Sequence, residues 1–282
     1  MVRYELGARL RLGLLGRPVV KSLSPSIHQA FAEQHHLQME YRVAETSLTE
    51  LAERLAEWSE AGFSGINLTL PLKEAGFRLC CEWTDAAARC RAVNVLIRTK
   101  GGWAGDNTDG TGFWTDLTER HGFLSQGHPV LVVGSGGAAR GILHALLKAG
   151  ETVCLAVRDR TRGSRLVEDF VQTGSPRIPV IDLGTSLAAT RWSLIVNATS
   201  AGHSGRVPAL DPSIFKEHPW AYDLEYGGAG QPFTRWAQEK GAARVLDGLG
   251  MLVEQAAASF ERWTGRKPLT DPIYHVLRSR SL

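Results

Sequence analysis

The chain has 282 residues, of which 43% are hydrophobic and 22% are charged, and its formal net charge at pH 7 is +3. This length exceeds that of an average single domain, so we expect two domains. Lysine and arginine are interleaved with aspartate and glutamate along the whole chain. Such a pattern gives no electrostatic support to a nucleic-acid partner or to binding at a membrane surface.

Four cysteines occur without the paired C-x-x-C spacing of a metal or redox site: Cys80, Cys81, Cys90 and Cys154. A reduced, cytoplasmic protein is the simplest interpretation, and we expect no metal. The N-terminal residues lack an uninterrupted apolar stretch because they include Arg3, Glu5, Arg9 and Arg11. No other stretch is long and apolar enough to cross a bilayer, so we also expect no membrane partner.

Short β-rich runs alternate with longer amphipathic segments, which is typical of parallel sheets joined by crossover helices, so we predict the α/β class. In the first part, residues 10–15, 41–44 and 65–69 are expected strands of one sheet. Residues 26–36 and 48–61 have apolar positions three and four apart and are expected helices.

The pattern breaks near Gly101 and Gly102, and turn-forming residues at 107–110 precede an expected helix over 111–120. The domain change is predicted there. Further strands are expected at 130–133, 152–157, 178–181, 194–197 and 221–224. Two closing helices, 251–263 and 272–280, have no strand partner nearby and are expected to pack back on the first domain. The prediction is a first domain of residues 1–109, with a mostly parallel sheet completed by residues 248–282, and a second α/β domain of residues 110–247, of Rossmann type.

A glycine-rich turn follows the apolar run 130–133 and leads into the expected helix 140–148; it reads Gly134-Ser135-Gly136-Gly137-Ala138-Ala139. Between a strand and a helix, this G-x-G-x-x-A pattern predicts a dinucleotide site. Gly134 permits the tight turn, Gly136 lets the backbone approach a pyrophosphate, and Ala139 lets the helix pack closely on the strand. The helix N-terminus offers N–H groups to the phosphates. A tight turn without a ligand, or a methyltransferase site, is the alternative.

The next strand ends at Val157, where an NAD site usually has an acidic residue, and Arg158 follows it. Arginine suits the 2′-phosphate of NADP and fits the cofactor of a methyltransferase poorly. Asp159 keeps NAD open, because its carboxylate could repel a phosphate or bind a ribose hydroxyl. The sequence therefore favours NADP, with NAD as the alternative.

Ser24 is an expected N-cap with Pro25 at the first helical position, and a helix start that also presents the Ser22 hydroxyl could bind a carboxylate. A cap without a ligand is the alternative interpretation of these residues.

Asn67 and Thr69 alternate with apolar residues at the end of the strand 65–69, and a proline-led turn then brings in Lys73. Ligands of α/β sheets bind at the carboxyl ends of strands. A catalytic Lys73 would need partial burial or a nearby carboxylate to organise its proton, and a solvent-facing helix lysine is the alternative. Asn94 and Asp109 are ambiguous singly, because Asn94 could be a turn residue and Asp109 an N-cap.

Together these segments resemble the shikimate dehydrogenase family, including its shikimate/quinate dehydrogenase branch. The match runs in order along nearly the whole chain: SLSPSIH at 22–28, NLTLPLK at 67–73, AVN at 92–94, DNTDG at 106–110, GSGGAARG at 134–141, NATSAG at 197–202, YDLEY at 222–226 and DGLGMLVEQAA at 247–257.

The resemblance implies the reversible NADPH-dependent reduction of 3-dehydroshikimate to shikimate, a step of aromatic amino acid biosynthesis. It implies that Lys73 and Asp109 form the catalytic acid–base pair and that Ser22 and Ser24 hold the substrate carboxylate. The implied substrate-binding residues are Ser22, Ser24, Thr69, Lys73, Asn94, Asp109, Tyr226 and Gln255. The implied cofactor-binding residues are Asp85, Gly134, Ser135, Gly136, Gly137, Ala138, Arg158, Asp159, Leu224, Gly248 and Met251. Of these, Leu224, Gly248 and Met251 would lie beside the nicotinamide, and Asp85 would lie near its edge.

Three departures from the family pattern bear on substrate and cofactor preference. Val95 stands where the family usually has threonine, Val157-Arg158-Asp159 replaces its usual Asn-Arg-Thr, and residues 227–231 lack the common proline and threonine. An NAD-preferring quinate/shikimate dehydrogenase, or a paralogue acting on a related cyclic polyol acid, is therefore one alternative. A dinucleotide-binding regulator without turnover is another, and the retention of both Lys73 and Asp109 disfavours it. The expected partner is a small-molecule substrate, shikimate or 3-dehydroshikimate, bound by a monomer or homodimer.

Overall fold

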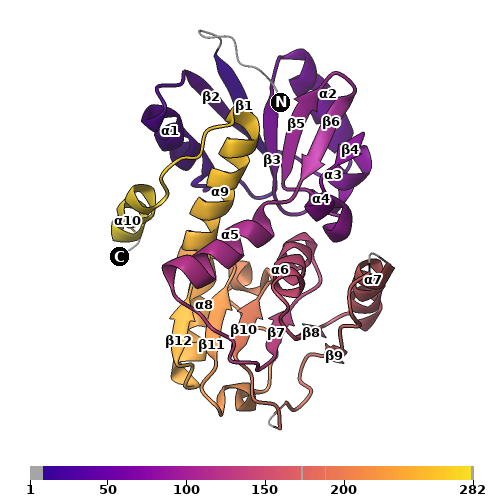
Figure 1. Ribbon diagram of the computed structural model, residues 1–282, viewed down its shortest axis with the longest axis vertical. Coiled ribbons are helices and arrows are strands. Elements are labelled where there is room, and N and C mark those ends of the chain that lie inside the picture. The colour runs from indigo at the N-terminus through magenta and orange to yellow at the C-terminus, as the bar shows by residue number, and fades with distance from the viewer. Residues whose placement is uncertain (1–8, 173, 188, 281–282) are drawn as a thin grey trace. The chain divides into compact units, whose positions relative to one another are not determined.

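The computed structural model describes residues 9–172, 174–187 and 189–280, and the chain forms two compact units (Figure 1). Within these residues, the first unit comprises residues 9–112 and Leu252–Arg280, and the second comprises Phe113–Met251. Each unit contains a six-stranded sheet with helices, so the predicted α/β class is confirmed. Among the described helices, none combines the length and the apolar character that a bilayer crossing needs.

The sheet of the first unit has the strand order β2-β1-β3-β5-β6-β4. Its strands are β1 (Leu10–Gly16), β2 (Met39–Glu45), β3 (Gly65–Leu68), β4 (Glu82–Trp83), β5 (Val95–Thr99) and β6 (Gly102–Asp106). β1 pairs in parallel with β2 and β3, so the three strands predicted for one sheet do share it. β5 pairs antiparallel with β3 and with β6, and β4 pairs in parallel with β6.

Gly101 and Gly102, where the sequence pattern breaks, lie at a hairpin turn inside the first unit. Thr99 pairs with Gly102 across the β5–β6 hairpin. Gly102 has φ +137°, a backbone conformation that residues with a side chain rarely adopt. Gly102, one of the two glycines that interrupt the hydrophobic pattern, is thus a residue that this turn between two strands requires.

Helices cover both faces of this sheet. They are α1 (Ser24–Gln34), α2 (Leu51–Glu60), α3 (Lys73–Leu79), α4 (Asp85–Cys90), α10 (Asp271–Arg280) and, from residue 252 onwards, α9 (Leu249–Thr264). Alternation along β3 decides which helix each side chain meets. Ile66 and Leu68 pack in one core with Leu55 of α2, whereas Asn67 donates a hydrogen bond to Ser259 of α9. The polar side chain of β3 therefore lies on the face that α9 covers.

The sheet of the second unit is entirely parallel, with the order β12-β11-β10-β7-β8-β9. This is the doubly wound order of a Rossmann fold. The strands are β7 (Val130–Val133), β8 (Val153–Val157), β9 (Val180–Asp182), β10 (Leu194–Asn197), β11 (Trp220–Asp223) and β12 (Arg244–Leu246). α6 (Gly137–Lys148) and α7 (Arg160–Gln172) share a core on one face, and α8 (Gly227–Glu239) packs on the other. β12 is absent from the sequence prediction because three residues do not establish a period.

α5 (Asp109–Thr115) is followed by a π-helical turn, Asp116–Arg120, so the single helix expected over 111–120 has two parts. Asp116 is fully buried in the second unit. Its Oδ2 accepts a hydrogen bond from the Tyr222 hydroxyl at 2.6 Å, and its Oδ1 accepts one from Arg120 Nε at 3.0 Å. Burial raises the pKa of Asp116, and the Tyr222 and Arg120 donors oppose that rise. A buried carboxylate thus joins the π-helical turn to β11.

Gly65 of β3 faces the indole ring of Trp263 in α9, and a Cβ at this position would overlap that ring. Gly65→Ala is therefore expected to lower the free energy of unfolding by about 1–3 kcal/mol, the usual cost of overpacking a core. Gly101→Ala is the matched control, because its Cβ would lie 3.7 Å from Cys81 Sγ, an ordinary contact. Urea denaturation measures both variants. Equal stabilities for the two would contradict the close packing of α9 on β3.

Candidate active site

Lys73 is the first residue of α3, and its side chain is only 14% exposed. Its Nζ donates a hydrogen bond to Oδ2 of Asp109 at 2.6 Å, and the Asp109 side chain is 4% exposed. The interpretation of Lys73 as a solvent-facing helix lysine is therefore wrong. Asp109 lies inside α5 as its first residue, so the interpretation of Asp109 as an N-cap is wrong as well.

Asn94, which directly precedes β5, holds the second oxygen of this carboxylate. Its Nδ2 donates to Oδ1 of Asp109 at 2.9 Å and lies 3.1 Å from Oε1 of Gln255. The Oδ1 of Asn94 accepts the backbone N–H of Thr108 at 2.8 Å, which fixes the orientation of the amide. Both oxygens of Asp109 therefore have a donor, and the carboxylate cannot turn away from Lys73 without losing one.

A lysine held in this way can exchange a proton with a ligand oxygen. The ammonium group has three N–H donors, and Asp109 occupies one of them. A general acid or base must lie within about 2.6–3.2 Å of the atom that it protonates. The pair at the end of β3 therefore suits a reaction that interconverts a carbonyl and an alcohol.

A buried amide, Asn67, contacts this group from inside the sheet. Its Nδ2 donates to the backbone carbonyl of Asn94 at 3.1 Å and to Oγ of Ser259 at 3.2 Å. Its Oδ1 accepts from the Tyr41 hydroxyl at 2.8 Å and lies 3.2 Å from Nε2 of His28. The backbone carbonyl of Asn94 can only accept a hydrogen bond, so the Asn67 side-chain nitrogen must face it. The side-chain oxygen of Asn67 therefore faces His28, which must donate through its Nε2–H.

His28 is fully buried, and burial lowers its pKa to about 3 although the hydrogen bond to Asn67 opposes the shift. It is therefore neutral at neutral pH. The sequence alone points to none of His28, Tyr41 and Ser259. A usable signal exists for Ser259, because it follows Gln255 by four residues and so lies on the same face of α9. His28 has only the pattern of a core residue on the buried face of α1.

Ser22 and Ser24 are hydrogen-bonded to each other at the start of α1, but the predicted N-cap at Ser24 is wrong. Leu23 occupies the N-cap position with helical backbone angles of φ −81° and ψ −7°, and no side chain caps the helix. The helix therefore starts at Ser24, with Pro25 as its second residue. Ser22 Oγ donates to Ser24 Oγ at 3.1 Å and accepts from the backbone N–H of Ser24 at 3.2 Å.

The remaining residues predicted to bind substrate fall in both units. Thr69 follows β3, where its N–H donates to the Leu15 carbonyl at 3.0 Å. Tyr226 is half-buried in the N-cap position of α8, in the second unit. Within the first unit, four of the predicted residues form one hydrogen-bonded group: Lys73, Asn94, Asp109 and Gln255.

The glycine turn after β7 has the form that a pyrophosphate cradle needs. Gly134 has φ +116°, and a Cβ on it would lie 2.8 Å from the carbonyl oxygen of Ala198, so a side chain does not fit. A Cβ on Gly136 would meet nothing within 4 Å, so the space above this residue is open. α6 begins at Gly137, three residues before the expected start, and the first N–H groups of a helix lack partners within it. These residues fit a dinucleotide phosphate.

Arg158 is exposed and directly follows the last residue of β8. Asp159 caps α7, because its Oδ1 accepts the backbone N–H of Arg162 at 3.0 Å. This carboxylate therefore has a structural role in addition to the two considered from the sequence. The next arginine, Arg160, forms an exposed ion pair with Asp182 at 2.9 Å.

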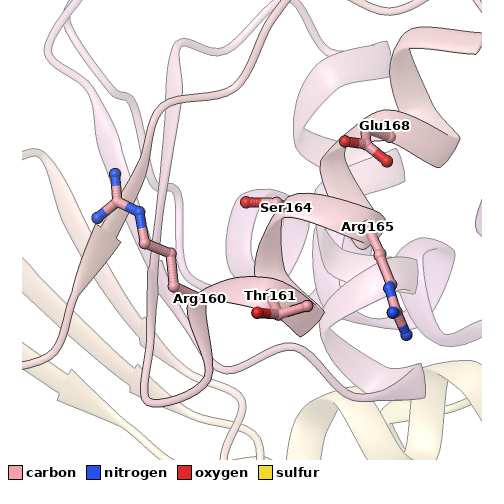
Figure 2. A pocket seen from close by; sticks show the side chains of 5 residues that line it. All are labelled: Arg160, Thr161, Ser164, Arg165 and Glu168. Atoms are coloured by element: carbon pink, nitrogen blue, oxygen red, sulfur yellow. The ribbon is translucent and has the colours of Figure 1, made fainter.

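A surface hollow of about 420 Å³ lies over the first turns of α7 (Figure 2). Figure 2 shows the guanidinium groups of Arg160 and Arg165 pointing away from each other, with Glu168 on the next turn of the helix. The lining thus carries charges of both signs, and it includes no residue predicted to bind substrate or cofactor. We assign no ligand to this hollow.

Three residues predicted to lie beside the nicotinamide belong to the second unit. Leu224 and Gly248 are in contact, because a Cβ on Gly248 would overlap the backbone of Leu224. Met251, the third residue of α9, is 7% exposed. Asp85, the fourth predicted neighbour, is the exposed first residue of α4 in the first unit.

Comparison with known proteins covers both units. The family described as the shikimate dehydrogenase substrate binding domain matches residues 14–96, and the shikimate 5′-dehydrogenase C-terminal domain matches residues 248–278. A shikimate dehydrogenase (NADP(+)) from Xylella fastidiosa is 42% identical over 272 residues, which cover 95% of this chain and 96% of that protein. Another, from Alcanivorax borkumensis, is 40% identical over 267 residues, covering 94% and 95%. Among solved structures, shikimate 5-dehydrogenase from Thermus thermophilus, in complex with NADP(H) and shikimate, is 35% identical with a TM-score of 0.81, covering 97% of this chain and 100% of that chain.

The buried neutral His28 makes stability depend on pH. Its folded pKa of about 3 lies below the ordinary value of 6.5, so between these values the unfolded chain binds a proton that the folded chain does not. The folded state therefore loses free energy of unfolding as the pH falls from 6.5, the ordinary pKa of histidine, towards about 3, the folded pKa of His28. His28→Gln keeps a donor for Asn67 but does not titrate.

We expect the wild-type protein to lose free energy of unfolding relative to His28→Gln on acidification, by up to about 1.4 kcal/mol per pH unit. Urea denaturation of both proteins at a series of pH values between neutral and mildly acidic measures the difference. Parallel pH dependences for the two proteins would contradict a buried, neutral His28.

Proposed function

We propose that this chain, which belongs to the shikimate dehydrogenase family, catalyses the reversible NADPH-dependent reduction of 3-dehydroshikimate to shikimate, a step of aromatic amino acid biosynthesis. It is thus an NADP-dependent oxidoreductase acting on a CH–OH group. The observation that carries the proposal is the buried hydrogen bond of 2.6 Å between Lys73 and Asp109.

Lys73 and Asp109 handle the proton of this reaction. Bound NADPH supplies the hydride that reduces the carbonyl carbon of the substrate. The Lys73 ammonium donates a proton to the carbonyl oxygen as negative charge develops there, and in the reverse direction the neutral amine takes it back. Asp109 keeps Nζ aimed and stabilises the ammonium form through a charge-assisted hydrogen bond. Asn94 keeps the carboxylate from turning.

The first unit acts as the substrate-binding domain. The hydroxyls of Ser22 and Ser24 are 3.1 Å apart, so both can donate to one substrate carboxylate once Ser22 turns its proton from Ser24 to the ligand. A substrate that lacks a ring hydroxyl leaves buried polar groups unpaired and is rejected for that reason. The side chains of this unit that bind the ring hydroxyls are Thr69, Asn94 and Gln255.

The second unit acts as the dinucleotide-binding domain. The open space above Gly136 and the N-terminus of α6 support binding of the pyrophosphate there. Arg158 binds the 2′-phosphate through its planar guanidinium group. Asp159 caps α7 through Oδ1, so this carboxylate has a structural role that does not require NAD as the cofactor. Leu224, Gly248 and Met251 of this unit would hold the nicotinamide.

A cytoplasmic location is part of the proposal. Among the described residues, no disulfide bond joins Cys80, Cys81, Cys90 or Cys154, which suits a reducing compartment. All residues assigned above come from one chain, so the proposed site is compatible with a monomer or a homodimer.

A spectrophotometric assay of NADPH and NADH formation, with shikimate and quinate as substrates, tests the function. We expect the highest kcat/KM for shikimate with NADP⁺. Preference for quinate or for NAD⁺ would move the chain to the shikimate/quinate branch of the family. Absence of turnover with every pair of substrate and cofactor would overturn the proposal in favour of a dinucleotide-binding regulator.

Lys73→Met removes the proposed proton donor and keeps a side chain of similar length. We expect kcat for shikimate oxidation to fall by about 10²- to 10⁴-fold, the range typical of a general acid–base group. Lys100→Met, at an exposed lysine in the β5–β6 turn, is the control and should keep the wild-type kcat. A Lys73→Met enzyme with undiminished kcat would remove Lys73 from the mechanism.

Arg158→Ala removes the proposed ligand of the 2′-phosphate. We expect KM for NADP⁺ to rise by about ten-fold or more, the equivalent of one hydrogen bond to a charged group, with little change in KM for NAD⁺. Arg160→Ala is the control, because Arg160 is paired with Asp182. Equal losses with both cofactors in Arg158→Ala would show that this side chain does not read the 2′-phosphate.

A further inference from the structure

Asp116 and Tyr222 form a buried pair in the second unit that the proposed chemistry does not use. Both side chains are fully buried. The Tyr222 hydroxyl donates its proton to Oδ2 of Asp116 at 2.6 Å. Because a hydroxyl has one proton to give and two lone pairs with which to accept, this bond leaves the phenol oxygen as an acceptor for another group.

The start of α9 lies beside this pair. Burial and the Asp116 carboxylate raise the pKa of Tyr222, and the backbone N–H of Met251, the third residue of the helix, opposes this rise. N–H groups in the first turn of a helix have no acceptor within the helix, so they need one outside it. The N–H of Leu249, the first residue, donates to Oδ1 of Asp247 at 3.2 Å. Asp247 therefore provides an acceptor for the first N–H group of α9.

Asp116 also fixes the position of this turn by direct contact. Gly250 lies so close to the Asp116 carboxylate that a Cβ on Gly250 would overlap it. The carboxylate is in turn held by Arg120, whose Nε donates to Oδ1 at 3.0 Å. The position of Gly250, and of Met251 after it, therefore depends on the Asp116 carboxylate. The hydroxyl of Tyr222 and the side chain of Arg120 hold that carboxylate in place.

We propose that Tyr222 is a positioning residue for the nicotinamide half of the cofactor and that it acts through the Asp116 carboxylate, against which Gly250 in the first turn of α9 packs. This inference rests on the proposed function, in which Gly248 and Met251 lie beside the nicotinamide. Tyr222 is buried on β11 and does not need to touch the cofactor. A shift of Met251 would move the surface against which the nicotinamide rests, and a misplacement of about 1 Å at a reacting group costs on the order of 10²-fold in rate.

Tyr222→Phe tests the proposal because it removes the hydroxyl and keeps the ring, which packs edge-on against Phe113 with 5.1 Å between ring centroids. Calorimetric titration uses two probes. NADP⁺ contains the nicotinamide, whereas adenosine 2′,5′-bisphosphate contains the 2′-phosphate and lacks the nicotinamide. Trp220→Phe, two residues earlier on β11 with its ring against Phe123, is the matched control.

In Tyr222→Phe we expect NADP⁺ to bind about three- to ten-fold more weakly, the fold-change of one hydrogen bond, and the bisphosphate to bind within about two-fold of wild type. We expect kcat for shikimate oxidation to fall by about ten-fold or more, with KM for shikimate unchanged. Trp220→Phe should keep both affinities. If Tyr222→Phe does not fold, Asp116→Asn removes the acceptor charge that orients the phenol and should give the same contrast between the two probes.

Equal weakening of both probes would mean that the hydroxyl supports the unit as a whole, and would overturn the positioning role. Unchanged affinity for NADP⁺ together with unchanged kcat would overturn it as well. A wild-type protein that neither binds NADP⁺ nor oxidises shikimate would instead overturn the proposed function, so the two failures are distinguishable.

Discussion

The hydrogen bond between Lys73 and Asp109 determines what the rest of the first unit must supply. An ammonium and a carboxylate that are 14% and 4% exposed have lost most of their hydration, and each would be costly to bury without the other. The two residues begin different helices, α3 after β3 and α5 after β6. They can meet because β5 lies between β3 and β6 in the sheet, so the strand order brings together residues that are 36 positions apart.

The same strand order explains why Asn94 completes the group. It directly precedes β5, the strand between the two that lead to Lys73 and Asp109. From that position its side chain reaches Asp109, and its backbone carbonyl accepts a hydrogen bond from Asn67 on β3. α9 contributes Gln255 and Ser259 from the other end of the chain. The antiparallel hairpin is thus the element of the first unit that positions the proposed acid–base pair.

Strong local patterns made part of this structure predictable. The apolar run at Val130–Val133, followed by glycines and an amphipathic helix, specifies a strand, a turn and a helix within a short window. The β5–β6 hairpin and β12 lack such a signal, because glycines interrupt the hydrophobic pattern between β5 and β6 and β12 has a single buried residue, Leu246. The structure places the N-cap of α1 at Leu23, one residue before the predicted N-cap at Ser24. The difference lies in the backbone angles of Leu23, which the amino-acid composition does not encode.

The candidate site shows the same division. From the residues alone Lys73, Asn94 and Asp109 were each ambiguous, and the resemblance to a family grouped them. The structure supplied the contacts that decide between the alternatives, such as the burial of Lys73. Tyr222 and Asp116 are 106 positions apart, and His28 and Asn67 are 39 apart. No local pattern encodes such pairs. The two members are distant in the sequence, and they form their hydrogen bond only because the fold places them side by side.

A crystal structure of this protein with shikimate bound would test the central claim most directly. We predict that Lys73 Nζ stays hydrogen-bonded to Asp109 and that both side chains lie within about 2.6–3.2 Å of one and the same hydroxyl oxygen of shikimate. The ring carboxylate should face Ser22 and Ser24. A complex in which the pair is broken, or in which the carboxylate of shikimate faces Lys73 in place of a hydroxyl, would contradict the proposed mechanism.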